Sequence, residues 1–397
     1  MRKLKPVALV ILAAVSGSAM ASNNTTLIDQ QGVGNTANAN QVDPTAIGNL
    51  IDVTQIGDAN SSSSTQASDA VSNTMTHYQE GDGNMAESFQ QFMTESSSLE
   101  INQIGNNNDT TAEQLESLGS TQELNQAGEM NFMTITQTDT EASSIAVNQT
   151  GDMNDAIIMG QVFDILGSDV ILNQIGDDNM AQISQQSVVE FSSVSADQLG
   201  NQNNFDSEQL MGVFNSTVTA IQSGDMNDIE SDQENGVTSS TVLIAQTGTS
   251  NFGGALQQNG VANSTVSVTQ VGDGNFGGGV QDTGIDASVG IVSQSGTANM
   301  GVTQQAGGTS FASATVTQLG SMNDATLGQI TATSVTGSIF QNGTSNIAGV
   351  LQQGNMLSVA TTTQIGDLNQ HTTSQMLDSQ TAIATQNGTS NIGFIFQ

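Results

Sequence analysis

The sequence predicts an all-β protein: a β-solenoid of sixteen stacked strand-turn-strand repeats with cross-β, amyloid-like packing. Three observations predict this fold class. The motif Q-x-G-x-x-N recurs every 22 to 25 residues, the residues beside each motif alternate with period two, and a glycine lies between the alternating segments. The first glutamines of the sixteen motifs are Gln30, Gln55, Gln79, Gln103, Gln126, Gln149, Gln174, Gln198, Gln222, Gln246, Gln270, Gln294, Gln318, Gln341, Gln364 and Gln386.

The repeat STVSVTQVGDGNFGGGVQ, residues 264–281, shows how each element is predicted. Valines alternate with polar residues up to Gln270, and the alternate residues after Asn275 are Gly277, Gly279 and Gln281. A period of two is typical of a strand, because successive side chains point to opposite faces. Gly272 supplies a turn between the two strands without a Cβ penalty. Each repeat should therefore form a strand, a tight turn and a second strand, followed by a short loop.

Further positions extend the motif to S-x5-Q-x-G-x2-N-x5-Q. A second glutamine follows the asparagine by six residues in fifteen of the sixteen repeats, and Gln161 is displaced by one residue in the sixth. Stacking equal repeats puts glutamine above glutamine and asparagine above asparagine, so their amides can form hydrogen-bonded ladders. The candidate ladder residues are Gln30, Asn35, Gln103, Asn108, Gln114, Gln246, Asn251, Gln257, Gln270, Asn275, Gln281, Gln386, Asn391 and Gln397.

Some large residues interrupt the pattern of inward side chains. Most repeats have Ile, Val or Leu two residues before the first glutamine and Ala or Gly two residues after the asparagine. Small residues there let the two strands of one repeat approach each other. Met133 and Phe205 occupy the small-residue position, which predicts local bulging of their strands.

The chain divides into a leader and a repeat array. Arg2, Lys3 and Lys5 precede an apolar run and the small-residue site Ala19-Met20-Ala21, which together predict a secretory signal peptide over residues 1–21. The apolar run is too short for a membrane span. A short segment, residues 22–29, precedes the array at 30–397, which is acidic over 30–240 and less charged over 241–397.

Charge and composition exclude several partners. All three basic residues lie in the predicted signal peptide, so the mature chain opposes 38 acids with no cation, and its formal charge moves from −35 to −38. Such a chain cannot neutralise phosphates, so we expect neither nucleic acid nor an anionic membrane as a partner, and no membrane insertion. The chain has no cysteine, so its stability does not depend on disulfides.

The acids are unevenly distributed and many follow the turn glycine. Residues 22–240 contain 32 acids and residues 241–397 contain 6. Stacked carboxylates repel and should slow association, so we expect faster assembly with added salt or divalent ions, and sooner in 241–397 than in 22–240. Ca²⁺ is a possible ligand of the turn acids; the alternative is a solvated acidic face. The calcium candidates are Asp58, Asp82, Asp152 and Asp177.

The repeat resembles the curlin repeat of curli, the functional amyloid fibres of Gram-negative biofilms. The matching positions are the serine, the two glutamines, the glycine and the asparagine described above, and they extend from Gln30 to Gln397. The resemblance implies a protein exported through the periplasm and an outer-membrane pore, which polymerises at the cell surface on a nucleator subunit. It also implies that the glutamine and asparagine ladders carry assembly.

No catalytic set is visible in the sequence, and we expect neither enzymatic activity nor a cofactor. His77 and His371 are the only histidines, and each takes a position that is apolar or small in other repeats. The first motif begins nine residues after the predicted cleavage and the last ends on Gln397, which leaves no room for capping segments and favours head-to-tail addition into a fibre. The alternative is a monomeric extracellular β-solenoid that acts as an adhesin or as a ligand- or ice-binding module. An ice-binding face would need a regular threonine array, and the residue before the first glutamine is not regular.

Overall fold

The computed structural model describes residues 23–41 and 44–397, and every regular element among them is a β-strand. The chain forms two compact units, residues 1–162 and 163–397, which we describe separately. The predicted signal peptide, residues 1–21, lies outside the described residues. The first strand begins at Thr25, so it takes in most of the segment 22–29.

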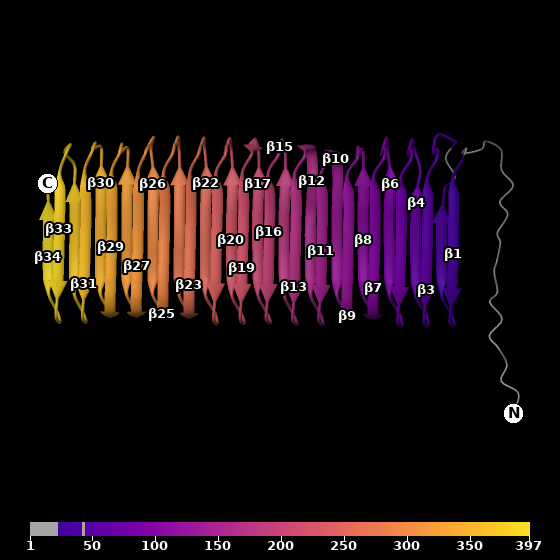
Figure 1. Ribbon diagram of the computed structural model, residues 1–397, viewed down its shortest axis with the longest axis horizontal. Coiled ribbons are helices and arrows are strands. Elements are labelled where there is room, and N and C mark those ends of the chain that lie inside the picture. Colours follow the sequence, from indigo (N-terminus) through magenta and orange to yellow (C-terminus); the bar gives the residue numbers. More distant parts are fainter. Residues whose placement is uncertain (1–22, 42–43) are drawn as a thin grey trace, which may run out of the picture. The chain divides into compact units, whose positions relative to one another are not determined.

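The first unit contains two parallel sheets (Figure 1). One sheet has the order β1-β3-β5-β7-β9-β11 and the other β2-β4-β6-β8-β10. The strands are β1 (Thr25–Gln31), β2 (Thr36–Asn40), β3 (Leu50–Ile56), β4 (Ser61–Gln66), β5 (Thr74–Glu80), β6 (Met85–Gln91), β7 (Ser98–Asn106), β8 (Asp109–Leu115), β9 (Thr121–Glu129), β10 (Phe132–Glu141), β11 (Ser144–Thr150) and β12 (Asp155–Leu166), which runs on into the second unit.

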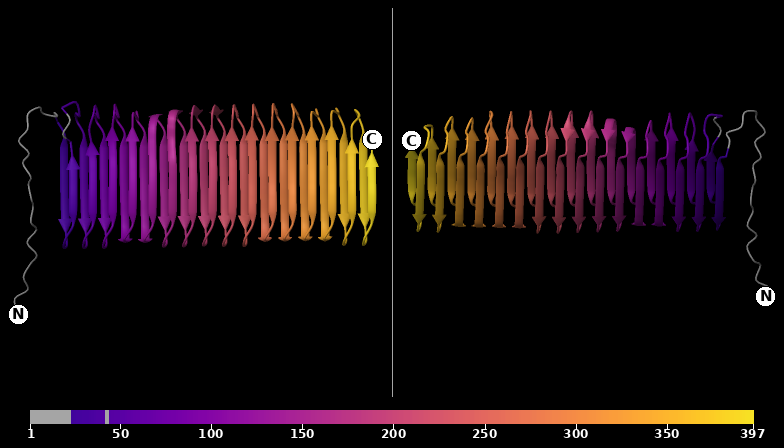
Figure 2. Two further views of the ribbon diagram at one scale, coloured as in Figure 1. Left: turned by 180° about the vertical axis from the view of Figure 1, so that it is seen from behind. Right: turned by 45° about the horizontal axis from the view of Figure 1, so that its top comes forward.

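The second unit repeats this arrangement with two parallel sheets, β13-β16-β19-β21-β23-β25-β27-β29-β31-β33 and β14-β17-β20-β22-β24-β26-β28-β30-β32-β34 (Figure 2). Its strands are β13 (Asp169–Ile175), β14 (Met180–Gln186), β15 (Val189–Glu190), β16 (Ser193–Leu199), β17 (Asn204–Leu210), β18 (Val213–Phe214), β19 (Thr217–Ser223), β20 (Asp228–Glu234), β21 (Thr241–Thr247), β22 (Phe252–Gln258), β23 (Thr265–Asp273), β24 (Phe276–Asp282), β25 (Val289–Thr297), β26 (Met300–Ala306), β27 (Ser313–Ser321), β28 (Asp324–Ile330), β29 (Thr336–Thr344), β30 (Ile347–Gln353), β31 (Val359–Ile365), β32 (Gln370–Gln375), β33 (Thr381–Asn387) and β34 (Ile392–Phe396).

Each repeat forms one coil, and each strand pairs with the equivalent strand of the next coil. In the β21–β23 pair, Val242 lies beside Val266 and Gln246 beside Gln270. The same one-to-one correspondence of motif positions holds along both units, so the predicted β-solenoid is confirmed. A register slip of one residue would turn every inward side chain outward, which is why the alternating pattern fixes the pairing.

The core lies between the two sheets of each unit and is formed by alternate residues of every strand. In β23 the buried positions are Val266, Val268 and Gln270, and in β24 they include Gly277 and Gln281. Gly277 is needed because a Cβ there would come within 2.7 Å of the Val268 side chain. The predicted small-residue position therefore has the expected packing reason.

The predicted bulging at Phe205 and Met133 is wrong. Phe205 is fully buried, and β17 pairs residue for residue with both β14 and β20. Met133 is also fully buried, within an unbroken pairing of β10 with β8. The first strand of the Phe205 coil has Ala196 where most coils have Ile, Val or Leu, so the volumes within that coil compensate without a backbone insertion.

A third, narrow ladder follows the arc that links one coil to the next. Short bridges connect successive arcs in each unit, as between β15 and β18. Beneath them in the second unit lies a buried apolar column of Ile165, Val189, Val213, Val237, Val261 and Ile285. The predicted short loop is therefore a packed side of the coil with its own core.

Candidate functional site

Two columns of buried glutamines form continuous hydrogen-bonded ladders within each unit. Gln246 donates from Nε2 to Oε1 of Gln270 at 2.9 Å, and Gln270 donates in the same way to Gln294 at 2.9 Å. The second column behaves alike: Gln257 donates to Gln281 at 2.8 Å, and Gln281 to Gln305 at 2.8 Å.

Most ladder glutamines use the remaining amide hydrogen on a backbone carbonyl. Gln270 Nε2 also donates to the carbonyl of Phe252, at the start of a strand in the opposite sheet, at 2.8 Å. Gln281 Nε2 donates to the Thr265 carbonyl at 3.2 Å. Because both amide hydrogens and the carbonyl oxygen have partners, these polar side chains can be buried without an unmet hydrogen bond.

The asparagine column joins side chains to the turns. Asn275 donates from both its backbone nitrogen, at 3.1 Å, and Nδ2, at 3.0 Å, to Oδ1 of Asn251. Asn275 Nδ2 also donates to the carbonyl of Gly296 in the next coil at 3.0 Å. The sequence predicts an amide-to-amide ladder here, and the structure adds a hydrogen bond to the carbonyl of the turn glycine.

The structure brings the sequence-predicted ladder residues into these columns. Gln30 donates to Gln55 at 2.6 Å, and Asn60 donates from its backbone nitrogen to Asn35 Oδ1 at 2.9 Å. The displaced Gln161 still takes its place, since Gln137 donates to its Oε1 at 2.7 Å. The remaining candidates lie in the same columns: Gln103, Asn108, Gln114, Gln246, Asn251, Gln257, Gln386, Asn391 and Gln397.

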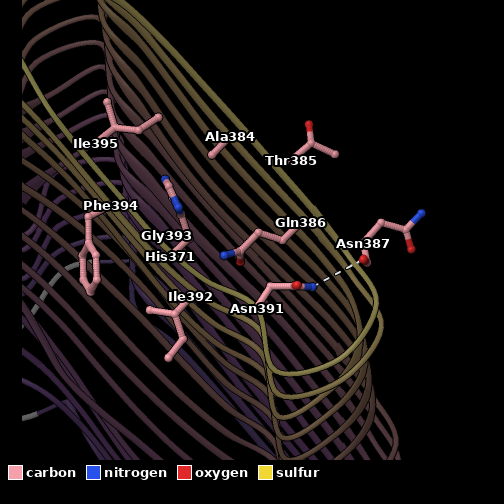
Figure 3. A pocket seen from close by; sticks show the side chains of 10 residues that line it. All are labelled: His371, Ala384, Thr385, Gln386, Asn387, Asn391, Ile392, Gly393, Phe394 and Ile395. Carbon is pink, nitrogen blue, oxygen red and sulfur yellow. Dashed lines mark hydrogen bonds between the residues drawn. The ribbon is translucent and has the colours of Figure 1, made fainter.

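The ladders have a direction. Within each unit every ladder glutamine that is followed by another coil donates toward the coil of higher residue number, so a coil offers glutamine oxygens on one edge and glutamine N–H groups on the other. Figure 3 shows the interior of the last described coil, a hollow of about 430 Å³ lined by Gln386, Asn391 and Gly393 among others. Asn391 Nδ2 there donates to the Asn387 carbonyl at 3.3 Å.

The serine position has a role that the sequence reasoning missed. Ser192 Oγ donates to the Glu190 carbonyl at 3.0 Å and accepts from the Ser216 backbone nitrogen at 3.1 Å. The serine column therefore hydrogen-bonds the backbone of the arcs, as the asparagine column hydrogen-bonds the backbone of the turns. The available signals were its six-residue offset from the first glutamine in ten repeats and, in the second unit, the apolar residue three positions before most of these serines.

The turn acids bond to the backbone of the preceding coil. Asp58 Oδ1 accepts from Val33 N at 2.7 Å, Asp82 Oδ1 from Asp58 N at 2.8 Å, and Asp152 Oδ1 from Glu129 N at 2.8 Å. Asp177 donates from its own backbone nitrogen to Asn201 Oδ1 at 2.9 Å. The described residues contain no group of three or more His, Cys, Asp or Glu side chains placed to hold a metal ion. Calcium binding at these turns stays a prediction.

Both histidines lie inside the coils. His77 is 1% exposed and its ring hydrogen-bonds Ser62 Oγ through Nδ1 and Ser88 Oγ through Nε2, each at 2.7 Å. Burial lowers the pKa of His77 to about 3. His371 bonds Thr373 Oγ1 at 2.9 Å, and burial lowers its pKa as well. The described neighbours of His77 are hydroxyls and apolar groups, which fit a neutral imidazole inside the core.

The chain matches no protein-family model and no curated protein sequence. Among the described residues no helix is long and apolar enough to cross a membrane.

Proposed function

We propose that this chain is a secreted structural subunit that assembles into curli-like extracellular fibres by continuing its coil stack from one copy into the next. The direction of the ladders supports this proposal most. A coil edge with glutamine N–H donors is complementary to an edge with glutamine oxygens, because the two columns and the asparagine column keep the same positions in every coil.

Backbone pairing supports the same contact. Among the described strands, β33 and β34 pair on one side, with β31 and β32, and β1 and β2 pair with β3 and β4. Unpaired strand edges are templates for another chain. A second copy that stacks in register would pair two of its strands with the exposed edge strands and would continue the three amide columns. This is the self-templating arrangement of a cross-β assembly.

The secreted location and the biofilm setting rest on the sequence. The predicted signal peptide and the resemblance to curlin repeats favour export through the periplasm and an outer-membrane pore, with a nucleator subunit as a partner. The hydrogen bonding of the ladder glutamines favours a structural role over an enzymatic one, because their amides are committed to one another and to the backbone.

Purified chain 22–397 tests the proposal when it is incubated and followed by sedimentation, with electron microscopy of the pellet. Fibres that seed fresh protein support assembly. A chain that remains a soluble monomer for days with seeds present would refute it, and would favour the solitary adhesive or ligand-binding solenoid. A strand spacing near 4.8 Å does not distinguish the two, because a monomeric solenoid has it too.

A further inference from the structure

An unusual group of acids lies on the outward face of two neighbouring strands in the second unit. Strand β17 presents Asp206 and Glu208, and strand β20 presents four more carboxylates on the same face. In register, Asp206 lies beside Glu230 and Glu208 beside Asp232. We call these six residues the acidic face: Asp206, Glu208, Asp228, Glu230, Asp232 and Glu234.

The flanking strands offer the acidic face no positive charge. On β14 the residues beside Asp206 and Glu208 are Gln182 and Ser184. On β22 the residues beside Glu230 and Asp232 are Gly254 and Leu256. The sequence contains no Lys or Arg after Lys5, so the carboxylates face only one another and neutral side chains.

The geometry leaves these carboxylates poorly compensated. Asn204 Nδ2 donates to Asp228 Oδ1 at 2.9 Å, yet Asp206 Oδ1 is buried and has no hydrogen-bond partner among the described residues. Carboxylates on paired strands lie about 5 Å apart, where two like charges repel by about 1 kcal/mol in water and by more where solvent is excluded. A protonated carboxyl can instead donate a hydrogen bond to its neighbour.

We propose that the acidic face is a proton-operated control of coil stacking, in which ionised carboxylates loosen the β17–β20 pair at neutral pH and protonation in mild acid closes it. This inference rests on the coil structure and does not depend on the proposed fibre assembly. It identifies the β17–β20 pair as the part of the stack whose stability depends on the protonation of these carboxylates.

The direction of the effect follows from linkage. Burial, and then repulsion from Glu208, Glu230, Glu234 and Asp206, raises the pKa of Asp232 from 3.8 to about 7. Burial and neighbouring acids also raise the pKa values of Asp206 and Glu208. A group with a raised pKa in the folded state binds more protons there, so stability is greatest below the unfolded value and falls as pH rises between about 4 and 7.

Hydrogen exchange on the soluble chain 22–397 measures this control locally. We compare the wild-type chain with Asp232→Asn at pH 5 and pH 8, and follow the amides of β17 and β20 against those of β27 and β28. At pH 8 the substitution should raise the protection of the β17 and β20 amides by roughly 10-fold. This factor is smaller than the full pKa shift of Asp232 would give, because solvent screens the partly exposed carboxylate. At pH 5 the two chains should differ much less, and β27 and β28 should not respond at either pH.

Two further variants test whether the effect belongs to the acidic face. Asp206→Asn should act in the same direction as Asp232→Asn. Asp178→Asn removes one charge from an exposed turn of the same unit and should leave β17 and β20 unchanged. Equal protection of β17 and β20 in wild type and Asp232→Asn at pH 8, or the same gain in Asp178→Asn, would overturn the proposal. Either result can be read whether or not the chain forms fibres.

Discussion

Gln246 Nε2 lies 2.9 Å from Gln270 Oε1, and these two residues occupy equivalent positions 24 residues apart. The contact makes a buried polar side chain the partner of its own equivalent in the next coil. Each coil of the ladder therefore offers amide N–H donors on one edge and amide oxygens on the other.

The central ladder is tested by Gln270→Ala. The substitution leaves the Gln246 amide without its acceptor and Gln294 Oε1 without its donor, both in the core. Each unmet buried group costs about 1–3 kcal/mol, so the free energy of unfolding should fall by about 2–5 kcal/mol. Urea unfolding measures it.

The matched control is Gln304→Ala, the same substitution at an outward, exposed glutamine of β26. It should change stability by no more than about 0.5 kcal/mol. Equal losses in the two variants would show that glutamine content matters and the ladder does not.

The turn glycines should tolerate no side chain. Gly272 has φ of 113°, and a Cβ there would run into the carbonyl of Gly296 in the next coil. Gly272→Ala should therefore separate two coils and cost more than about 3 kcal/mol. Gly349→Ala is the control, because a Cβ at Gly349 meets nothing within 4 Å. Comparable thermal midpoints for the two variants would contradict the stacked-turn geometry.

His77 should make the coil stack sensitive to acid. Its pKa is about 3 in the fold against 6.5 in the unfolded chain, so the unfolded chain binds more protons below pH 6.5. Stability from this group is complete above pH 6.5 and is lost as pH falls toward 3, by up to about 1.4 kcal/mol per pH unit. This trend is opposite in sign to that of the acidic face.

His77→Ile should remove that part of the acid sensitivity but lower stability at pH 7 by about 1–3 kcal/mol, since Ser62 and Ser88 lose their partner. Adding Ser62→Ala and Ser88→Ala should recover much of the loss. Urea midpoints at pH 5 and pH 7 give both comparisons. An unchanged pH dependence in His77→Ile would place the acid sensitivity elsewhere.

Salt should shorten the lag before assembly, because residues 22–240 contain 32 acids and no cation. Raising the salt from 0.1 M to 1 M shortens the screening length from about 10 Å to about 3 Å, below the spacing of stacked carboxylates. Light scattering at matched ionic strength with Na⁺, Mg²⁺ or Ca²⁺ checks this. A lag that does not respond to salt contradicts the charge argument, and a response to Ca²⁺ alone would point to calcium sites at turns such as Asp58 and Asp82.

Residues that recur at a constant position in the repeat could be assigned to their columns from the sequence alone. Residues equivalent to Gln270 and Asn275 recur at fixed distances in every repeat, so their stacking follows from the periodicity alone. The arc was harder to predict. Val213 and Ser216 also recur, but a loop of small polar residues shows no period-two pattern, and its core became visible only in three dimensions.

Compensation between residues was the other feature that the sequence concealed. Phe205 predicts a bulge when it is compared with the small residues of other repeats, whereas Ala196 in the same coil leaves space for its ring. The acidic face was also hidden, since Glu208 and Asp232 are 24 residues apart in sequence and become neighbours only through the register of β17 and β20.

Mass per unit length of the assembled fibre tests the central claim most directly. If copies continue one another's coil stack, a single filament contains one coil of about 24 residues for every ~4.8 Å of its length, along the joins as well as within each copy. We predict this value, or a whole multiple of it where filaments pair side by side, in fibres that form without a lag when seeded. A chain that stays monomeric with seeds present, or fibres whose mass per length is not a whole multiple of one coil, would contradict the account.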